Sequence, residues 1–103
     1  MIYALDFDGV LDNPLIQRLV LKLKRERNEI WVVTMRRDDT YNNDIMHPVL
    51  DKLYITKINV VYSNGKSKCQ LLKSINADIY IDNVSTEFNQ IKETTKIIPL
   101  LFN

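Results

Sequence analysis

Acidic, hydroxyl and lysine side chains follow the ends of several apolar segments in this 103-residue sequence. The set consists of Asp6, Asp8, Thr34, Lys66, Lys68 and Asp82. Carboxylates that gather at one place repel one another unless a divalent cation or a proton intervenes. Oxygen ligands suit Mg²⁺, and a lysine and a hydroxyl beside that cation form a site for a phosphate group. The residue types therefore predict a magnesium and phosphate site, provided that the fold brings them together.

Apolar segments of strand type alternate with segments of helical periodicity along the chain. Strands are expected at residues 1–5, 29–34, 58–62, 78–82 and 96–99. Helices are expected from Pro14 onward and at residues 44–53, 68–75 and 85–93, with a polar loop at 36–43. This alternation predicts an α/β fold, a three-layer α/β/α sandwich around a Rossmann-like parallel sheet of five strands. Ligands of such sheets bind at the carboxyl ends of the strands, where the polar set is expected to meet.

Two of the expected helices have clear start signals. Pro14 is favoured at a first helical position, and either Asp12 or Asn13 can cap that helix. Ser67 can cap the helix that begins at Lys68. Lys68 is then in the first turn, where it opposes the helix dipole. A locally unfavourable residue of this kind is more common at a functional site than elsewhere.

Composition indicates an ordinary globular domain over residues 1–103. The chain has 46% hydrophobic and 26% charged residues and a net charge of +1, which predicts no general attraction to nucleic acid or to an anionic membrane. One cysteine excludes an internal disulfide and is simplest in a reducing cytoplasm. No apolar run approaches the roughly 20 residues of a membrane span, so no membrane partner is expected.

The spacing of the polar residues resembles the motifs of the haloacid dehalogenase (HAD) superfamily. Residues 6–11, Asp-Phe-Asp-Gly-Val-Leu, are similar to its first motif, and residues 31–34, Trp-Val-Val-Thr, to its second. Lys68 or Lys66 would be the third motif and Asp82 the fourth. The motifs occur in the family order and cover almost the whole chain. The resemblance implies a HAD-like hydrolase and a phosphatase that uses Mg²⁺.

The resemblance also implies a role for each residue. Asp6 would be the nucleophile that forms an aspartyl phosphate, and Asp8 the general acid and base. Mg²⁺ would bind the carboxylates of Asp6 and Asp82 and the backbone carbonyl of Asp8. Thr34 would hydrogen-bond phosphoryl oxygens, and a lysine would neutralise charge on the transferred group.

The choice of the phosphate lysine stays open, and the fourth motif departs from the family pattern. The helix start favours Lys68 over Lys66 as the phosphate lysine. The fourth motif usually carries two acids, but Asn83 follows Asp82, and Glu87 would serve only if the segment between them folds back.

The substrate is expected to be large, because the sequence between the motifs leaves no room for a cap over the site. A nucleotide or a nucleic-acid end carrying a phosphate fits this openness, and Arg36 or Arg37 can bind phosphate there. A non-catalytic HAD-like binding or regulatory protein is the alternative. A receiver domain is excluded, because its acceptor aspartate would end the third strand, where Tyr62 and Ser63 stand.

Overall fold

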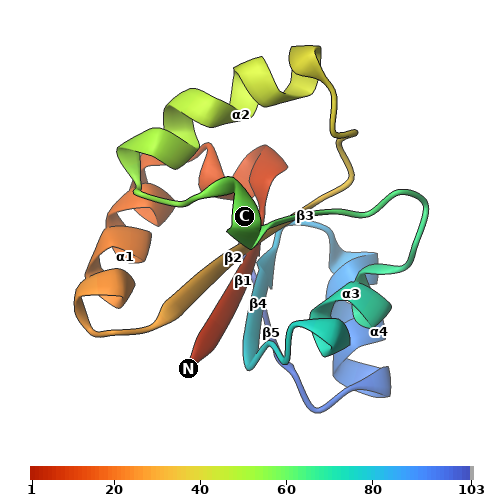
Figure 1. The fold of residues 1–103 in the computed structure, drawn as a ribbon. Helices are drawn as coiled ribbons and strands as arrows, with labels where there is room; N and C mark the ends of the chain where they lie inside the picture. The colour runs from red at the N-terminus through yellow and green to blue at the C-terminus, as the bar shows by residue number, and fades with distance from the viewer. Residues whose placement is uncertain (103) are drawn as a thin grey trace.

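The computed structural model describes residues 1–102 and contains one five-stranded parallel sheet (Figure 1). The strands are β1 (Ile2–Asp6), β2 (Glu29–Thr34), β3 (Val60–Tyr62), β4 (Ile79–Asp82) and β5 (Ile98–Leu101). The helices are α1 (Pro14–Arg25), α2 (Thr40–Lys52), α3 (Lys68–Ser74) and α4 (Ser85–Thr94). Two short helical turns, at Phe7–Leu11 and Lys57–Asn59, complete the set. The predicted fold class is therefore confirmed.

The chain adds strands first on one side of β1 and then on the other. The order is β3-β2-β1-β4-β5, so the chain runs from β1 outward to β3 and then crosses to β4 on the other side. Two neighbouring strands whose connections leave in opposite directions open a crevice at their carboxyl ends, which is where ligands of open α/β sheets bind. Asp6 and Asp82 end the two strands, β1 and β4, that border this crevice.

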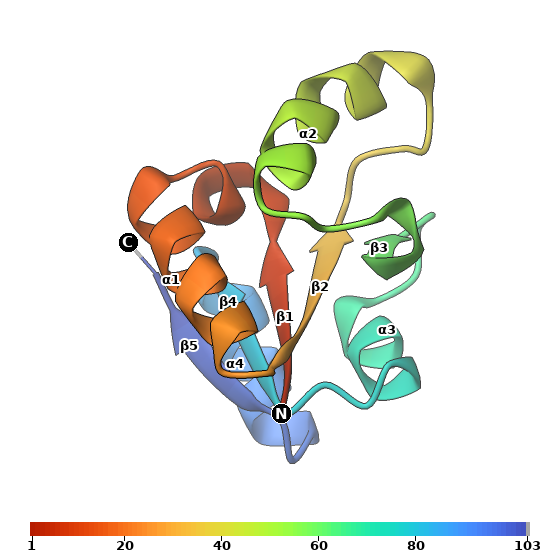
Figure 2. The ribbon, with the colours of Figure 1, turned by 60° about the vertical axis from the view of Figure 1, so that its left-hand side comes forward.

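Side-chain alternation along the strands produces a separate apolar core on each face of the sheet. Leu5, Val32 and Ile81 pack in one core with residues of α1 and α2. Their sequence neighbours Ala4, Val33 and Tyr80 pack in the other core with residues of α3 and α4. Figure 1 shows these helix pairs on opposite sides of the strands, and in Figure 2 α1 lies in front of the strands and α4 behind them. A strand buried on both faces has no polar alternation, which explains its continuous apolar sequence.

The start signals of α1 and α3 operate as predicted. The Asn13 side chain accepts a hydrogen bond from the Leu15 backbone N–H at 2.9 Å, and Pro14 takes the first helical position. The Ser67 hydroxyl accepts one from the Gln70 backbone N–H at 3.3 Å. Lys68 consequently opens α3.

The predicted start of α2 was wrong by one turn, because residues 40–43 form a helix rather than a loop. Asp39 caps it by accepting from the Asn42 backbone N–H at 2.9 Å. Asn43 is buried, where it accepts from the Tyr62 hydroxyl at 2.6 Å and donates to Asp38 at 2.8 Å. These polar contacts across the fold stabilise a turn that has no apolar periodicity.

Several strand boundaries also differ from the prediction: β1 and the start of β4 by one residue, and the start of β3 and both ends of β5 by two. Residues 57–59 form a helical turn that leaves Ile58 82% exposed, so β3 begins at Val60 instead of residue 58. β5 begins at Ile98 instead of residue 96, in register with Ile79 of β4. Within residues 1–102, none of the helices combines the length and the hydrophobicity that crossing a bilayer requires.

Candidate active site

Asp6, Lys68 and Asp82 form a buried cluster at the carboxyl edge of the sheet. Leu5 pairs with Ile81 across β1 and β4, so the next residues along the two strands lie side by side. The Lys68 Nζ lies 3.4 Å from the Asp6 Oδ1 and 3.1 Å from the Asp82 Oδ2. All three side chains are at most 10% exposed. Asp6 and Asp82, far apart in the sequence, therefore converge on the Lys68 ammonium group.

The Asp82 carboxylate is held by donors on both oxygens. The Tyr80 hydroxyl donates to the Oδ2 at 2.6 Å, next to Lys68. The backbone N–H groups of Asn83 and Val84 donate to the Oδ1 at 2.6 and 3.1 Å. Hydrogen bonds to a charged acceptor favour the ionised form and fix its orientation.

Tyr80 was missed by the sequence analysis. The sequence contained a signal for this contact. Side chains two residues apart on a strand point to the same face of the sheet, and Tyr80 precedes Asp82 by two residues. Burial, with the Asp82 carboxylate as an added cause, raises the pKa of the Tyr80 phenol far above its usual value, so the hydroxyl remains a donor. Its ring also lies 5.6 Å from the Lys68 Nζ, within cation–π range.

Asp6 is a buried carboxylate with incomplete charge compensation. Its Oδ1 accepts from the Phe7 backbone N–H at 3.0 Å and faces Lys68. Burial, with the nearby Asp82 as an added cause, raises the pKa of Asp6 to about 6 against the opposing attraction of Lys68. Two carboxylates and one ammonium group leave the cluster with one negative charge in excess.

Lys68, not Lys66, is the lysine that the fold brings to the carboxylates. Lys68 is 5% exposed at the start of α3. Lys66 is exposed in the preceding turn, where its backbone N–H donates to the Ser63 carbonyl at 2.9 Å. The two candidates thus occupy different environments, and only Lys68 contacts Asp6 and Asp82 among the ion pairs of residues 1–102.

Asp8 lies beside the cluster but its carboxylate faces Arg36. The guanidinium binds both Asp8 oxygens, with the Nη2 2.8 Å from the Oδ1 and the Nε 3.0 Å from the Oδ2. The Nη1 donates to the Asn42 side chain on α2 at 2.9 Å. The hydrogen bonds to Asp8 raise the pKa of Arg36. Arg36, expected to bind phosphate, is therefore occupied by the residue expected to be the general acid.

Thr34 lies at the same edge of the sheet, one strand from Asp6. Asp6 is paired with Val33, the residue before Thr34. Thr34 is fully buried, and its Oγ1 accepts from the Arg36 backbone N–H at 3.0 Å. The hydroxyl orients the loop that carries Arg36, and contact with phosphate remains a prediction.

Asn83 and Gly9 form a close contact between the first and fourth motifs. Gly9 has a φ of +77°, and a Cβ there would overlap the Asn83 side-chain amide. Only glycine combines this backbone conformation with this approach. Glu87, considered as a second acid, is in the first turn of α4, and no hydrogen bond or ion pair within residues 1–102 joins it to the cluster.

The donor set of the cluster fits a hard divalent cation. Asp6 and Asp82 supply carboxylate oxygens, and the excess negative charge between them favours a cation. Side chains of His, Cys, Asp or Glu do not gather in threes around a possible metal position in the described chain. The predicted Mg²⁺ ligands include only two carboxylates, those of Asp6 and Asp82, together with the Asp8 backbone carbonyl. Such a small set suits Mg²⁺, because this ion commonly keeps several water ligands.

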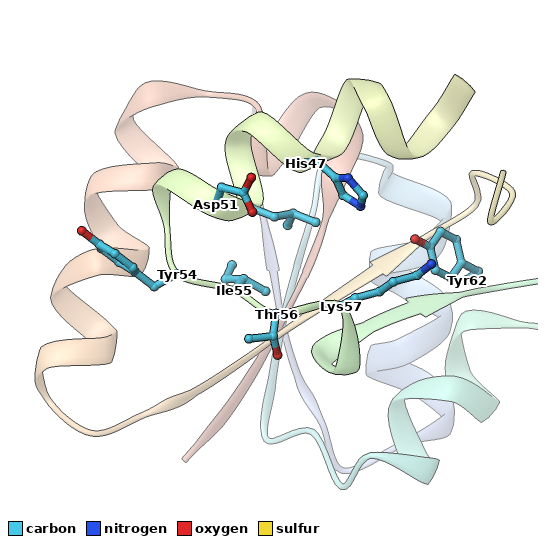
Figure 3. A pocket seen from close by; sticks show the side chains of 8 residues that line it. His47, Asp51, Tyr54, Ile55, Thr56, Lys57 and Tyr62 are labelled. Atoms are coloured by element: carbon cyan, nitrogen blue, oxygen red, sulfur yellow. The ribbon is translucent and has the colours of Figure 1, made fainter. Parts of the chain in front are cut away.

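A mostly apolar cavity of about 460 Å³ lies away from this cluster, between α2 and β3 (Figure 3). Its lining residues are His47, Leu50, Asp51, Tyr54, Ile55, Thr56, Lys57 and Tyr62. None of these residues belongs to the predicted site. The predicted site residues therefore stand outside this cavity, at the carboxyl edge of the sheet.

Comparisons with known proteins give a relative but no activity. No family model matches the chain. Over 80 residues it is 30% identical to "Uncharacterized protein L684" of Acanthamoeba polyphaga mimivirus. The match covers 74% of this chain and 16% of that protein, so the chain spans about one-sixth of its relative's length.

Proposed function

We propose that the chain is a Mg²⁺-dependent, HAD-type phosphomonoester phosphatase that acts through an aspartyl phosphate. The observation that carries this proposal is the buried Asp6, which shares Lys68 with Asp82 at the crevice of a parallel sheet. A buried carboxylate beside a fixed ammonium group can approach a phosphate dianion whose charge that ammonium partly neutralises. The resemblance of the motifs to those of the HAD superfamily supplies the role of nucleophile for Asp6.

The proposed reaction has two displacements at phosphorus. An Asp6 oxygen attacks and forms a bond to phosphorus while the bond to the leaving oxygen breaks, and Asp8 gives that oxygen its proton. Asp8 then takes a proton from a water molecule as its oxygen attacks the phosphorus, which releases phosphate and restores the Asp6 carboxylate. Lys68 neutralises charge on the transferred group throughout. In this proposal Asp8 acts only after Arg36 has released it, because the two side chains form an ion pair in the structure.

Asp6, Asp82 and the Asp8 backbone carbonyl would hold Mg²⁺. When bound, the cation lowers the repulsion between the attacking carboxylate and the phosphate. Tyr80 and the amides of Asn83 and Val84 keep the Asp82 carboxylate charged and oriented for this purpose.

The substrate class that we propose is a nucleotide or a nucleic-acid end phosphate. Asp8 is 52% exposed, and the segments between the motifs form only single helices and loops, so the site is open to a large molecule. The free thiol of Cys69 is consistent with a reducing cytoplasm as the place of action.

Hydrolysis of an aryl phosphate tests the proposed reaction. Wild-type protein with Mg²⁺ is expected to release phosphate, and Asp6→Asn is expected to lower kcat by at least a thousandfold because the amide is not a nucleophile. Asp44→Asn, an exposed position on α2, is the matched control and is expected to retain full activity. No turnover by wild type across a panel of phosphomonoesters, or equal turnover by Asp6→Asn, would contradict the proposal.

A non-catalytic phosphate-binding protein is the second candidate. The observation that favours it is the engagement of Asp8 by Arg36, which leaves the proposed acid without a free oxygen. This candidate predicts that Asp6 does not become covalently modified. Incubation with beryllium fluoride and Mg²⁺ distinguishes the two, because a stable adduct on Asp6 is expected only for the phosphatase.

A further inference from the structure

Two exposed cations beside the candidate active site have no role in the proposed reaction. Arg37 follows Arg36 in the loop after β2, and Lys66 stands in the turn after β3. Among the ion pairs of residues 1–102, Arg36 is paired with Asp8 and Lys68 with Asp6 and Asp82, whereas neither Arg37 nor Lys66 has a partner.

A polar hollow of about 480 Å³ lies between these two segments. It is lined by Met35, Arg36, Arg37, Asp38, Ser63, Asn64 and Gly65. The one acid in this set, Asp38, is already neutralised by Lys57 at 3.3 Å and accepts from Asn43 at 2.8 Å. With Arg36 neutralised by Asp8, the hollow keeps the positive charge of Arg37, and Lys66 adds a second positive charge directly after the lining residue Gly65.

The two walls of the hollow are joined by the backbone. The Ser63 N–H donates to the Thr34 carbonyl at 2.9 Å, so the turn after β3 is fixed to the end of β2. Asn64 and Gly65 have φ values of +48° and +79°, and the Lys66 N–H closes the turn on the Ser63 carbonyl at 2.9 Å. A closed turn in this conformation holds Lys66 near the hollow without a long flexible loop.

The position of the hollow relative to Asp6 sets the size of a ligand that reaches both. The hollow lies at the ends of β2 and β3, and β1 is the neighbour of β2. Neighbouring strands lie about 4.8 Å apart, so the hollow is displaced sideways from Asp6 by roughly 5 to 10 Å across the sheet. Two phosphate groups on one small molecule can span such a distance.

We propose that this hollow binds a second phosphate group of the substrate through Arg37 and Lys66, which makes the preferred substrate a bisphosphate rather than a simple monoester. The proposal rests on the proposed function for the position of the first phosphate. Guanidinium and ammonium groups that lack carboxylate partners bind a phosphate without first breaking an ion pair. Arg36 differs, because it would have to leave Asp8.

Binding to the inactive Asp6→Asn variant tests this proposal separately from hydrolysis. Calorimetry in EDTA, because this variant lacks one of the proposed Mg²⁺ ligands, would compare adenosine 5′-monophosphate with adenosine 3′,5′-bisphosphate. The bisphosphate is expected to bind at least tenfold more tightly, and the preference is expected to fall several-fold when Arg37→Ala or Lys66→Ala is added. Lys73→Ala removes an exposed charge from the opposite end of α3 and is expected to keep the preference.

Three results would overturn the second-phosphate site. They are equal affinity for the two nucleotides, no binding of either, and a preference that survives both Arg37→Ala and Lys66→Ala. Raising the salt concentration should also reduce the preference in Asp6→Asn more than in the variants that lack either cation, because exposed charges are screened. Failure of the proposed function would be seen differently, as an absence of hydrolysis by the wild-type protein.

Discussion

At the scale of single residues, the buried charge of Asp6, the proposed nucleophile, lowers the stability of the folded protein. The pKa of Asp6 in the folded state, about 6, lies above its ordinary value of 3.8. Protonation of Asp6 therefore stabilises the folded state relative to the unfolded state. That favourable contribution is complete below about pH 3.8 and is lost as the pH rises through about 6. The metal-free protein therefore carries an unfavourable buried charge at neutral pH.

We expect Asp6→Asn to stabilise the metal-free protein at pH 7 by about 1–3 kcal/mol. The gain should shrink as the pH falls from 7 to 4, because wild-type Asp6 then becomes neutral as well. Urea unfolding in EDTA at several pH values measures the difference between the two proteins, in which the titration of carboxylates distant from Asp6 cancels. A gain that does not change with pH would show that the charge of Asp6 is not its cause.

Gly9 and Gly65 have nearly the same φ but different surroundings. Alanine substitutions at the two positions therefore distinguish the cost of a left-handed backbone from the cost of a steric overlap. Gly9 has φ +77° and Gly65 has φ +79°, but a Cβ would overlap Asn83 only at Gly9. Gly65→Ala is expected to cost about 1–2 kcal/mol from the left-handed backbone alone. Gly9→Ala should cost more in the same urea titration, and equal losses would mean that Asn83 moves aside freely.

At the scale of elements, α4 begins without the side-chain cap that the other helices have. Val84 occupies its N-cap and makes no side-chain hydrogen bond, and Glu87 stands three residues later. Val84→Thr has nearly the same shape and adds a hydroxyl that would accept from the Glu87 backbone N–H, while the residue-84 backbone N–H stays bound to Asp82. We expect it to raise the free energy of unfolding by about 0.5–1 kcal/mol, whereas Val84→Ala should give no gain. Denaturant midpoints of the three proteins check this.

The element scale also shows how α2 is connected to the candidate active site. Asp39 caps α2 and its Oδ1 also accepts from the Asn42 side-chain amide at 2.8 Å. Asn42 in turn accepts from Arg36, which binds Asp8. A substrate that draws Arg36 away from Asp8 would therefore act on the first turn of α2 as well.

At the scale of the whole molecule, Mg²⁺ binding is expected to stabilise the folded protein. A ligand that binds only the folded state at a hundred times its Kd adds about 2.7 kcal/mol. Thermal unfolding should therefore show a higher Tm in Mg²⁺ than in NaCl of equal ionic strength. Asp6→Asn should lose most of this shift and Asp44→Asn should keep it. A shift of equal size in all three proteins would place the cation elsewhere.

The sequence by itself was sufficient for the fold class and for most elements. Continuous apolar runs and helix-start residues such as Asn13 and Ser67 act locally, so their effect can be predicted without knowing the partners. The convergence of Asp6 and Asp82 could also be predicted, because parallel strands bring their carboxyl ends to one edge. Mg²⁺, catalysis and the substrate remain predictions from motif and chemistry.

Only the tertiary structure decided which polar groups pair with one another. It paired Asp8 with Arg36, placed Lys68 rather than Lys66 between the carboxylates, and brought Tyr80 to Asp82. It also formed the first turn of α2 through the contacts of Asn43. The physical reason is that a hydrogen bond or ion pair depends on distances of about 3 Å between groups distant in the chain, which local propensity does not contain.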